Sequence, residues 1–123
     1  MNVLVTGAAG YIGSVAAEEL IKAGHTVVVF DNLSRGHRAA VPPEATFFYG
    51  DLLRPDSLDR CFREHPDIEG VMHFAAFALV PESMRDPGMY FQNNVTGSQN
   101  LLDAMVRAGV GRLIFSSTCA TYG

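Results

Sequence analysis

The stretch Asn2-Val3-Leu4-Val5-Thr6-Gly7-Ala8-Ala9-Gly10-Tyr11-Ile12-Gly13 decides the fold that this sequence predicts. Its first five residues form an apolar, β-branched run, which is typical of a buried strand. Glycines follow, and residues 11–23 then place apolar side chains on one face at helical spacing. Gly24 predicts the end of that helix. A strand, a glycine turn and a helix in this order indicate the first unit of a parallel α/β sheet.

The same alternation continues along the rest of the chain. Short apolar runs predict strands, and longer segments with one apolar face predict helices. The expected strands are residues 26–30, 46–49, 70–74 and 112–116, and the expected helices are residues 55–64 and about 84–108, with a polar loop over 31–43. This order predicts an α/β fold with a doubly wound, Rossmann-like parallel sheet of five strands in the order 3-2-1-4-5, with helices on both faces. We expect residues 1–123 to form one domain.

Composition narrows the classes of function. The 123 residues are 48% apolar and 18% charged, which is typical of a globular protein. The formal net charge of −4 argues against a nucleic-acid partner. No apolar run approaches the roughly 20 residues that a membrane span needs. Cys61 and Cys119 lack the spacing of metal ligands, so we expect no metal, and they predict reduced thiols in a cytoplasmic protein.

Gly7, Gly10 and Gly13 follow a G-x-x-G-x-x-G pattern between the first strand and the first helix. The start of a helix offers unpaired N–H groups and the positive end of its dipole to a phosphate. Glycines there allow a sharp turn and a close approach to a pyrophosphate, and the last one lets the helix pack tightly on the sheet. An ordinary strand-to-helix turn is the alternative. The strand before and the helix after favour a dinucleotide site.

Two acidic residues stand at the ends of expected strands. Asp31 stands 18 residues after Gly13, near the spacing at which an acid binds the adenosine ribose hydroxyls. A carboxylate there repels a 2′-phosphate and favours NAD over NADP. The alternative is that Asp31 and Asn32 only cap a turn. Asp51 either accepts the adenine amino group or starts a turn, and the sequence leaves both interpretations open.

Several motifs together carry a resemblance to a known family. They are residues 5–13, 31–34, 50–52, 73–76, 82–83, 93–97 and 115–123. On these motifs the chain resembles, over its whole length, the N-terminal part of the UDP-glucose 4-epimerases, which belong to the extended short-chain dehydrogenases/reductases. A set of motifs in order is far more specific than any one of them.

The resemblance implies NAD as the cofactor and assigns roles to individual residues. The implied cofactor contacts are Gly7, Gly10, Tyr11, Ile12, Gly13, Asp31, Asn32, Leu33, Asp51, Leu52, Phe74, Ala75, Ala76, Phe77 and Asn93. Thr118 is the implied catalytic residue, which hydrogen-bonds the sugar 4-oxygen. It is followed by Cys119-Ala120 rather than the Asp-Glu of sugar-nucleotide 4,6-dehydratases, which favours an epimerase. His73 fits a satisfied core histidine better than a catalytic one.

The implied reaction interconverts UDP-glucose and UDP-galactose through a 4-keto intermediate, and in the family a Tyr-x-x-x-Lys pair removes the hydroxyl proton. None of the tyrosines, at positions 11, 49, 90 and 122, is followed by that lysine, and Lys22 is the only lysine. We therefore expect the NAD-binding N-terminal part of a homodimeric enzyme, inactive alone. The sixth strand, the Tyr-x-x-x-Lys helix and the UDP-sugar region are expected beyond Gly123. A stand-alone dinucleotide-binding module and another sugar-nucleotide-modifying relative remain the alternatives.

Overall fold

The computed structural model describes residues 1–7, 11–32, 41–75 and 87–117. Its elements are β1 (Asn2–Thr6), α1 (Tyr11–Lys22), β2 (Thr26–Asp31), β3 (Thr46–Tyr49), α2 (Pro55–Glu64), β4 (Gly70–Ala75), α4 (Pro87–Ala108) and β5 (Arg112–Ser117). Every predicted element is present. The differences are single residues at the ends of α1, β2, β4 and β5, while the expected start of the long helix near residue 84 lies outside the described residues.

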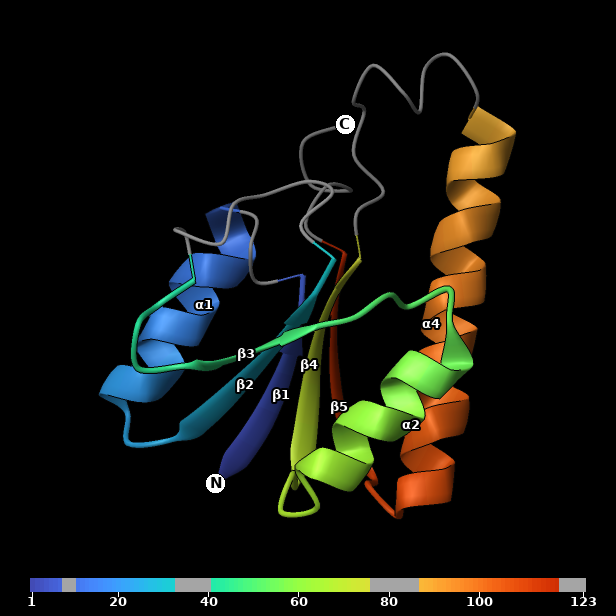
Figure 1. The fold of residues 1–123 in the computed structure, drawn as a ribbon. Coiled ribbons are helices and arrows are strands. Elements are labelled where there is room, and N and C mark those ends of the chain that lie inside the picture. Colours follow the sequence, from blue (N-terminus) through green and yellow to red (C-terminus); the bar gives the residue numbers. More distant parts are fainter. Residues whose placement is uncertain (8–10, 33–40, 76–86, 118–123) are drawn as a thin grey trace.

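The five strands form one parallel sheet in the order β3-β2-β1-β4-β5, which confirms the predicted order. β1 lies in the middle, as Figure 1 shows. The chain first builds outward on one side of β1, through β2 and β3, and then on the other side, through β4 and β5. The direction of building reverses between β1 and β4, and ligands of doubly wound sheets bind beside such a reversal, at the carboxyl ends of the strands.

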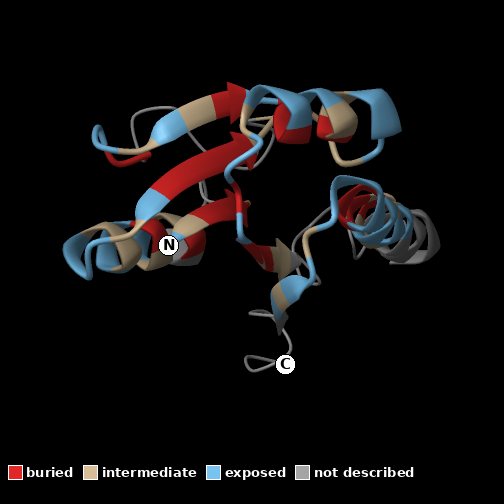
Figure 2. Cartoon of the chain, turned by 90° about the horizontal axis from the view of Figure 1, so that it is seen from below, coloured by how far each residue is buried: buried red, intermediate tan, exposed pale blue. Residues whose placement is uncertain are grey.

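Helices cover both faces of the sheet (Figure 1). Successive residues of β1 point to opposite faces, so each face receives its own core. On the α1 face, Val3 and Val5 join one buried cluster with Ala17 of the helix. On the other face, Leu4 joins a second cluster that includes Leu58 of α2 and Leu101 of α4. Figure 2 shows the buried residues along the central strands and on the inner sides of α2 and α4.

The helix ends follow the turn chemistry of the sequence. α1 ends at Gly24, where the N–H groups of Gly24 and His25 donate to the carbonyls of Ile21 and Leu20, a Schellman motif. Gly109 ends α4 in the same way. No helix in the described part of the chain is long and apolar enough to cross a membrane.

Candidate functional site

Gly7 directly follows β1 and makes the turn that leads toward α1. Its φ is +81°, in the left-handed region that favours glycine. Its N–H donates a hydrogen bond to the carbonyl of Phe30, with an N–O distance of 3.3 Å. A Cβ at this position would lie 3.0 Å from the carbonyl oxygen of Phe74 and 3.3 Å from its Cβ. Gly7 therefore keeps the turn close to the ends of β2 and β4, at the reversal point of the sheet.

The turn leads into α1, whose first residue is Tyr11. Gly13 is buried in the first turn of this helix, as expected for a glycine that lets a helix lie close to a sheet. Gly10 and the side chains of Tyr11 and Ile12 lie outside the described residues. The helix dipole places partial positive charge at the start of α1, on the side of the sheet where Gly7 turns.

Asp31 is the last residue of β2, the strand next to β1. It is half-buried, and its carbonyl oxygen accepts a hydrogen bond from the N–H of Gly50 at 3.1 Å. Asn32 follows it, and Leu33 lies outside the described residues. The structure thus brings Asp31 and Gly7, which the sequence singled out separately, to the same edge of the sheet on adjacent strands.

The turn after β3 is held by short contacts that leave no room at Gly50. A Cβ there would lie 2.5 Å from Cζ of Phe30 and 2.6 Å from Oγ of Ser57. The hydroxyl of Ser57 accepts a hydrogen bond from the N–H of Asp51 at 3.1 Å. The carboxylate oxygen Oδ1 of Asp51 accepts one from the N–H of Leu53 at 2.9 Å. Asp51 therefore starts a turn, and this contact engages one of its two carboxylate oxygens.

Helix α4 also contacts the turn after β3, at Leu52. The side-chain amide of Asn100 donates to the carbonyl of Leu52 at 2.9 Å. A Cβ on Gly97 would lie 3.1 Å from Cβ of Leu52, so the helix approaches the turn closely at this position. Sequence reasoning missed Asn100 and Ser57. The one signal was Gly97, which costs helix propensity inside a long helix and here has a packing reason.

His73 in β4 is buried, with 3% of its surface exposed, and both ring nitrogens have hydrogen-bond partners. Nδ1 lies 2.5 Å from the hydroxyl oxygen of Thr6, and Nε2 lies 2.9 Å from that of Ser98. Burial lowers the pKa of His73 to about 4, so the ring is neutral at physiological pH. His73 is a core histidine, as predicted, and ties β1, β4 and α4 together.

The structure describes the remaining predicted residues to different extents. Phe74 is half-buried, packs on the core of the α1 face and lies against Gly7. Ala75 ends β4, and its side chain is not described. Asn93 lies within α4, again without a described side chain. Ala76, Phe77 and Thr118 lie outside the described residues.

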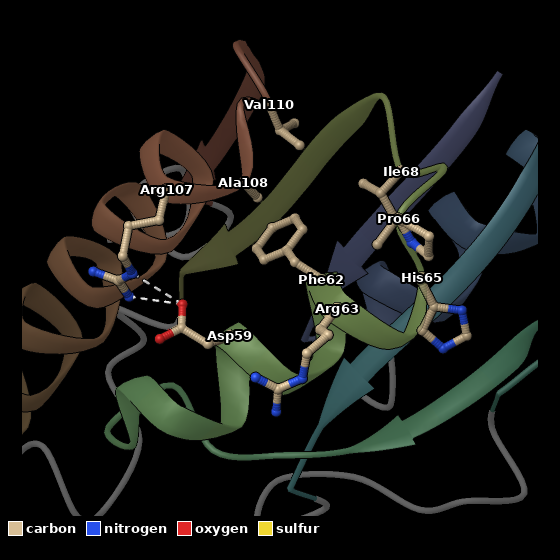
Figure 3. A pocket seen from close by; sticks show the side chains of 9 residues that line it. All are labelled: Asp59, Phe62, Arg63, His65, Pro66, Ile68, Arg107, Ala108 and Val110. Carbon is tan, nitrogen blue, oxygen red and sulfur yellow. Dashed lines mark hydrogen bonds and ion pairs between the residues drawn. The ribbon is translucent and has the colours of Figure 1, made fainter.

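A cavity of about 250 Å³ lies elsewhere, between the carboxyl ends of α2 and α4 (Figure 3). Phe62, Ile68 and Val110 line it, and at its rim the guanidinium of Arg107 contacts the carboxylate of Asp59 at 2.9 Å. These elements meet at the amino end of β4, which is the edge opposite Gly7. The cavity is therefore separate from the edge at which doubly wound sheets bind ligands.

The strand order and the glycine turn at its reversal point define the Rossmann-like class of α/β proteins. Residues 3–123 match the NAD dependent epimerase/dehydratase family, and the chain belongs to this family. The comparisons also confirm the resemblance to the N-terminal part of the UDP-glucose 4-epimerases.

Two relatives and two solved structures illustrate the similarity. The chain is 54% identical to the UDP-glucose 4-epimerase of Streptomyces lividans over 98% of its own length and 36% of the relative's. It is 50% identical to the UDP-glucose 4-epimerase of Lacticaseibacillus casei over 100% of its own length and 37% of the relative's. A Thermus thermophilus UDP-glucose 4-epimerase complex with NAD superposes with a TM-score of 0.87 and 45% identity, covering 96% of this chain and 38% of that one. A Thermotoga maritima UDP-glucose 4-epimerase with UDP-glucose gives a TM-score of 0.86 and 41% identity over the same shares. The chain thus spans little more than a third of these proteins.

Proposed function

We propose that the chain is the cofactor-binding part of an NAD-dependent UDP-sugar 4-epimerase, an isomerase that interconverts UDP-glucose and UDP-galactose. The observation that carries the proposal is Gly7, held at the reversal point of the sheet with a positive φ that favours glycine and with Phe74 close to where a Cβ would stand. The solved UDP-glucose 4-epimerase of Thermus thermophilus, 45% identical, was obtained as a complex with NAD.

The residues around Gly7 fit the two ends of an adenosine diphosphate. Gly7 has no Cβ to block a pyrophosphate that comes close to the turn, and the start of α1 presents N–H groups to that pyrophosphate. Asp31, one strand away, accepts hydrogen bonds from the ribose hydroxyls. The turn of Asp51 and Leu52 borders the adenine. The cofactor supplies a reversible hydride acceptor for the sugar C4.

The finer parts of the proposal concern residues whose contacts the structure does not describe. They are cofactor contacts at Gly10, Tyr11, Ile12, Leu33, Ala75, Ala76, Phe77 and Asn93, and a catalytic hydrogen bond from Thr118. We further propose a homodimeric complete enzyme in the cytoplasm, acting in galactose metabolism. The buried free thiol of Cys61 is consistent with a reducing compartment.

Calorimetric titration of the 123-residue chain with NAD and with NADP tests the cofactor site. We expect NAD to bind more tightly, because the carboxylate of Asp31 repels a 2′-phosphate. Replacing Asp31 with Ala removes charged hydrogen-bond acceptors, so NAD affinity should fall about tenfold or more and the preference over NADP should narrow. Glu44→Ala is the control, because it removes the same charge just before β3, at the amino edge of the sheet. It should leave the affinities for NAD and NADP unchanged. Equal NAD affinity in the wild type and in Asp31→Ala would remove Asp31 from the site.

A second experiment addresses the reaction. No tyrosine of these 123 residues is followed four residues later by lysine. We therefore expect the purified chain to convert no UDP-glucose into UDP-galactose, and measurable conversion would contradict this assignment of the base. Reading the coding sequence after Gly123 separates an epimerase from a stand-alone module, because only the former continues into a Tyr-x-x-x-Lys helix.

A further inference from the structure

Tyr49, the last residue of β3, is an exposed aromatic side chain at the edge of the sheet where Gly7 and Asp31 lie. Its exposed fraction is 64%, and it is the one aromatic residue among the exposed large hydrophobic residues of the described chain. Within the described ranges its ring and hydroxyl make no hydrogen bond or ring contact, so the fold gives it no packing role there. An exposed aromatic residue with no structural partner is a candidate ligand contact.

The sheet register places Tyr49 beside Asp31. The two residues are direct partners in the parallel pairing of β2 and β3, so their side chains leave the sheet on the same face. That face is the one covered by α1, because Val27 and Val29 precede Asp31 at alternate positions of β2 and join the cluster on α1. Neighbouring strands are about 5 Å apart, which brings the phenol ring of Tyr49 within reach of any group bound to the Asp31 carboxylate.

The backbone after Tyr49 is fixed relative to Asp31. The N–H of Gly50 donates to the Asp31 carbonyl, and Gly50 is enclosed so tightly that a Cβ there would have to displace Phe30 or Ser57. The direction in which β3 presents Tyr49 is therefore set by the same packing that sets the end of β2. Gly7, Asp31 and Tyr49 stand at the carboxyl ends of three neighbouring strands, β1, β2 and β3, so a dinucleotide that bound along this edge from Gly7 past Asp31 would reach Tyr49 next. Tyr49 borders this path on its open side.

We infer that Tyr49 forms the outer wall of the cofactor site and packs its ring against the adenosine half of the bound dinucleotide. The inference rests on the proposed function and adds a binding residue to it. Aromatic rings are common platforms for nucleobases, because every base has a π-face on which they can stack. The ring supplies apolar contact area beside the charged acceptor of Asp31, so one residue holds the ribose and the other shields the nucleoside from solvent.

ADP-ribose is the probe that tests this inference, since it carries the adenosine and pyrophosphate without the nicotinamide. In calorimetric titrations of the 123-residue chain, Tyr49→Ala should weaken ADP-ribose binding about fivefold to tenfold. Tyr49→Phe keeps the ring and should stay within about twofold of the wild type. Val106→Ala, an exposed truncation on α4, is the matched control and should leave binding unchanged.

Fluorescence adds a readout that a merely structural role would not move. The chain has no tryptophan, so its tyrosine emission is directly visible, and ADP-ribose should quench a component that Tyr49→Phe lacks. Wild-type affinity in Tyr49→Ala, or quenching in Tyr49→Phe of the same amplitude as in the wild type, overturns the inference while leaving the cofactor site standing. A folded wild-type chain that binds neither ADP-ribose nor NAD overturns the proposed function and this inference together.

Discussion

Replacing Gly50 with alanine tests the packing that fixes the turn after β3 against the end of β2. The added Cβ would lie 2.5 Å from Cζ of Phe30 and 2.6 Å from Oγ of Ser57, both inside van der Waals contact. Phe30 has no room to rotate, because it is 1% exposed and its ring stacks on Phe48 with centroids 5.7 Å apart. Ser57 is held as well, because its hydroxyl accepts the N–H of Asp51. Overfilling a core costs about 1–3 kcal/mol, and two restrained neighbours place this case near 3 kcal/mol.

Urea denaturation followed by circular dichroism measures this loss. With a slope of about 2 kcal/mol per molar urea, the midpoint of Gly50→Ala should fall by about 1.5 M. Gly111→Ala is the matched control, because a Cβ at Gly111 meets no atom within 4 Å, and its stability should change by less than about 0.5 kcal/mol.

A second variant identifies the atom responsible for the loss. Phe30→Leu removes the ring that obstructs the new Cβ, so the double variant Gly50→Ala/Phe30→Leu should be more stable than the sum of the two single changes predicts, by about 1 kcal/mol or more. A Gly50→Ala midpoint equal to that of the wild type would refute the packing argument. Simple additivity in the double variant would show that Phe30 is not the obstacle.

Two further predictions concern the core and the sheet edge. His73 has a pKa of about 4 in the folded protein against 6.5 when unfolded, so below pH 6.5 the unfolded chain takes up a proton that the folded chain refuses. The free energy of unfolding should therefore fall by up to about 3 kcal/mol between pH 6.5 and pH 4. In His73→Asn the urea midpoint should depend less on pH over this range. An unchanged pH dependence in this variant would contradict the neutral, buried state of His73. β5 is the last strand of the described sheet and exposes Ile114 at 61%. Unpaired strand edges promote self-association, so on a sizing column the chain should form larger species as its concentration rises. Ile114→Lys should suppress these species. A wild-type chain that stays monomeric at all concentrations would contradict this prediction.

The strand order was predictable because few arrangements satisfy the sequence pattern. Apolar runs such as residues 2–6 and 26–30 are too short for helices and are separated by segments with helical periodicity. Parallel strands joined by right-handed crossovers then leave the order 3-2-1-4-5 as the expected doubly wound arrangement. The placement of Gly7 and Asp31 at one edge of the sheet was predictable for a related reason, because each was expected at the carboxyl end of a strand and the strands are parallel.

Other features of the site needed the structure because they depend on distant partners. Asp51 had two interpretations in the sequence, and its hydrogen bond to the N–H of Leu53 shows the turn directly. The support of Leu52 by Asn100 joins residues 48 positions apart, and no local pattern indicates it. Tyr49 carries no motif, and its exposure and its register with Asp31 are visible only in the structure.

The sequence by itself determined the class of fold, the order of the strands and the location of the glycine turn, because hydrophobic periodicity and the chirality of crossovers act locally along the chain. The tertiary structure alone decided which side chains meet. It paired His73 with Thr6 and Ser98, enclosed Gly50 against Phe30 and set Tyr49 beside Asp31. These contacts arise from strand register and from the close packing of helices on the sheet, which bring together residues that the sequence keeps apart.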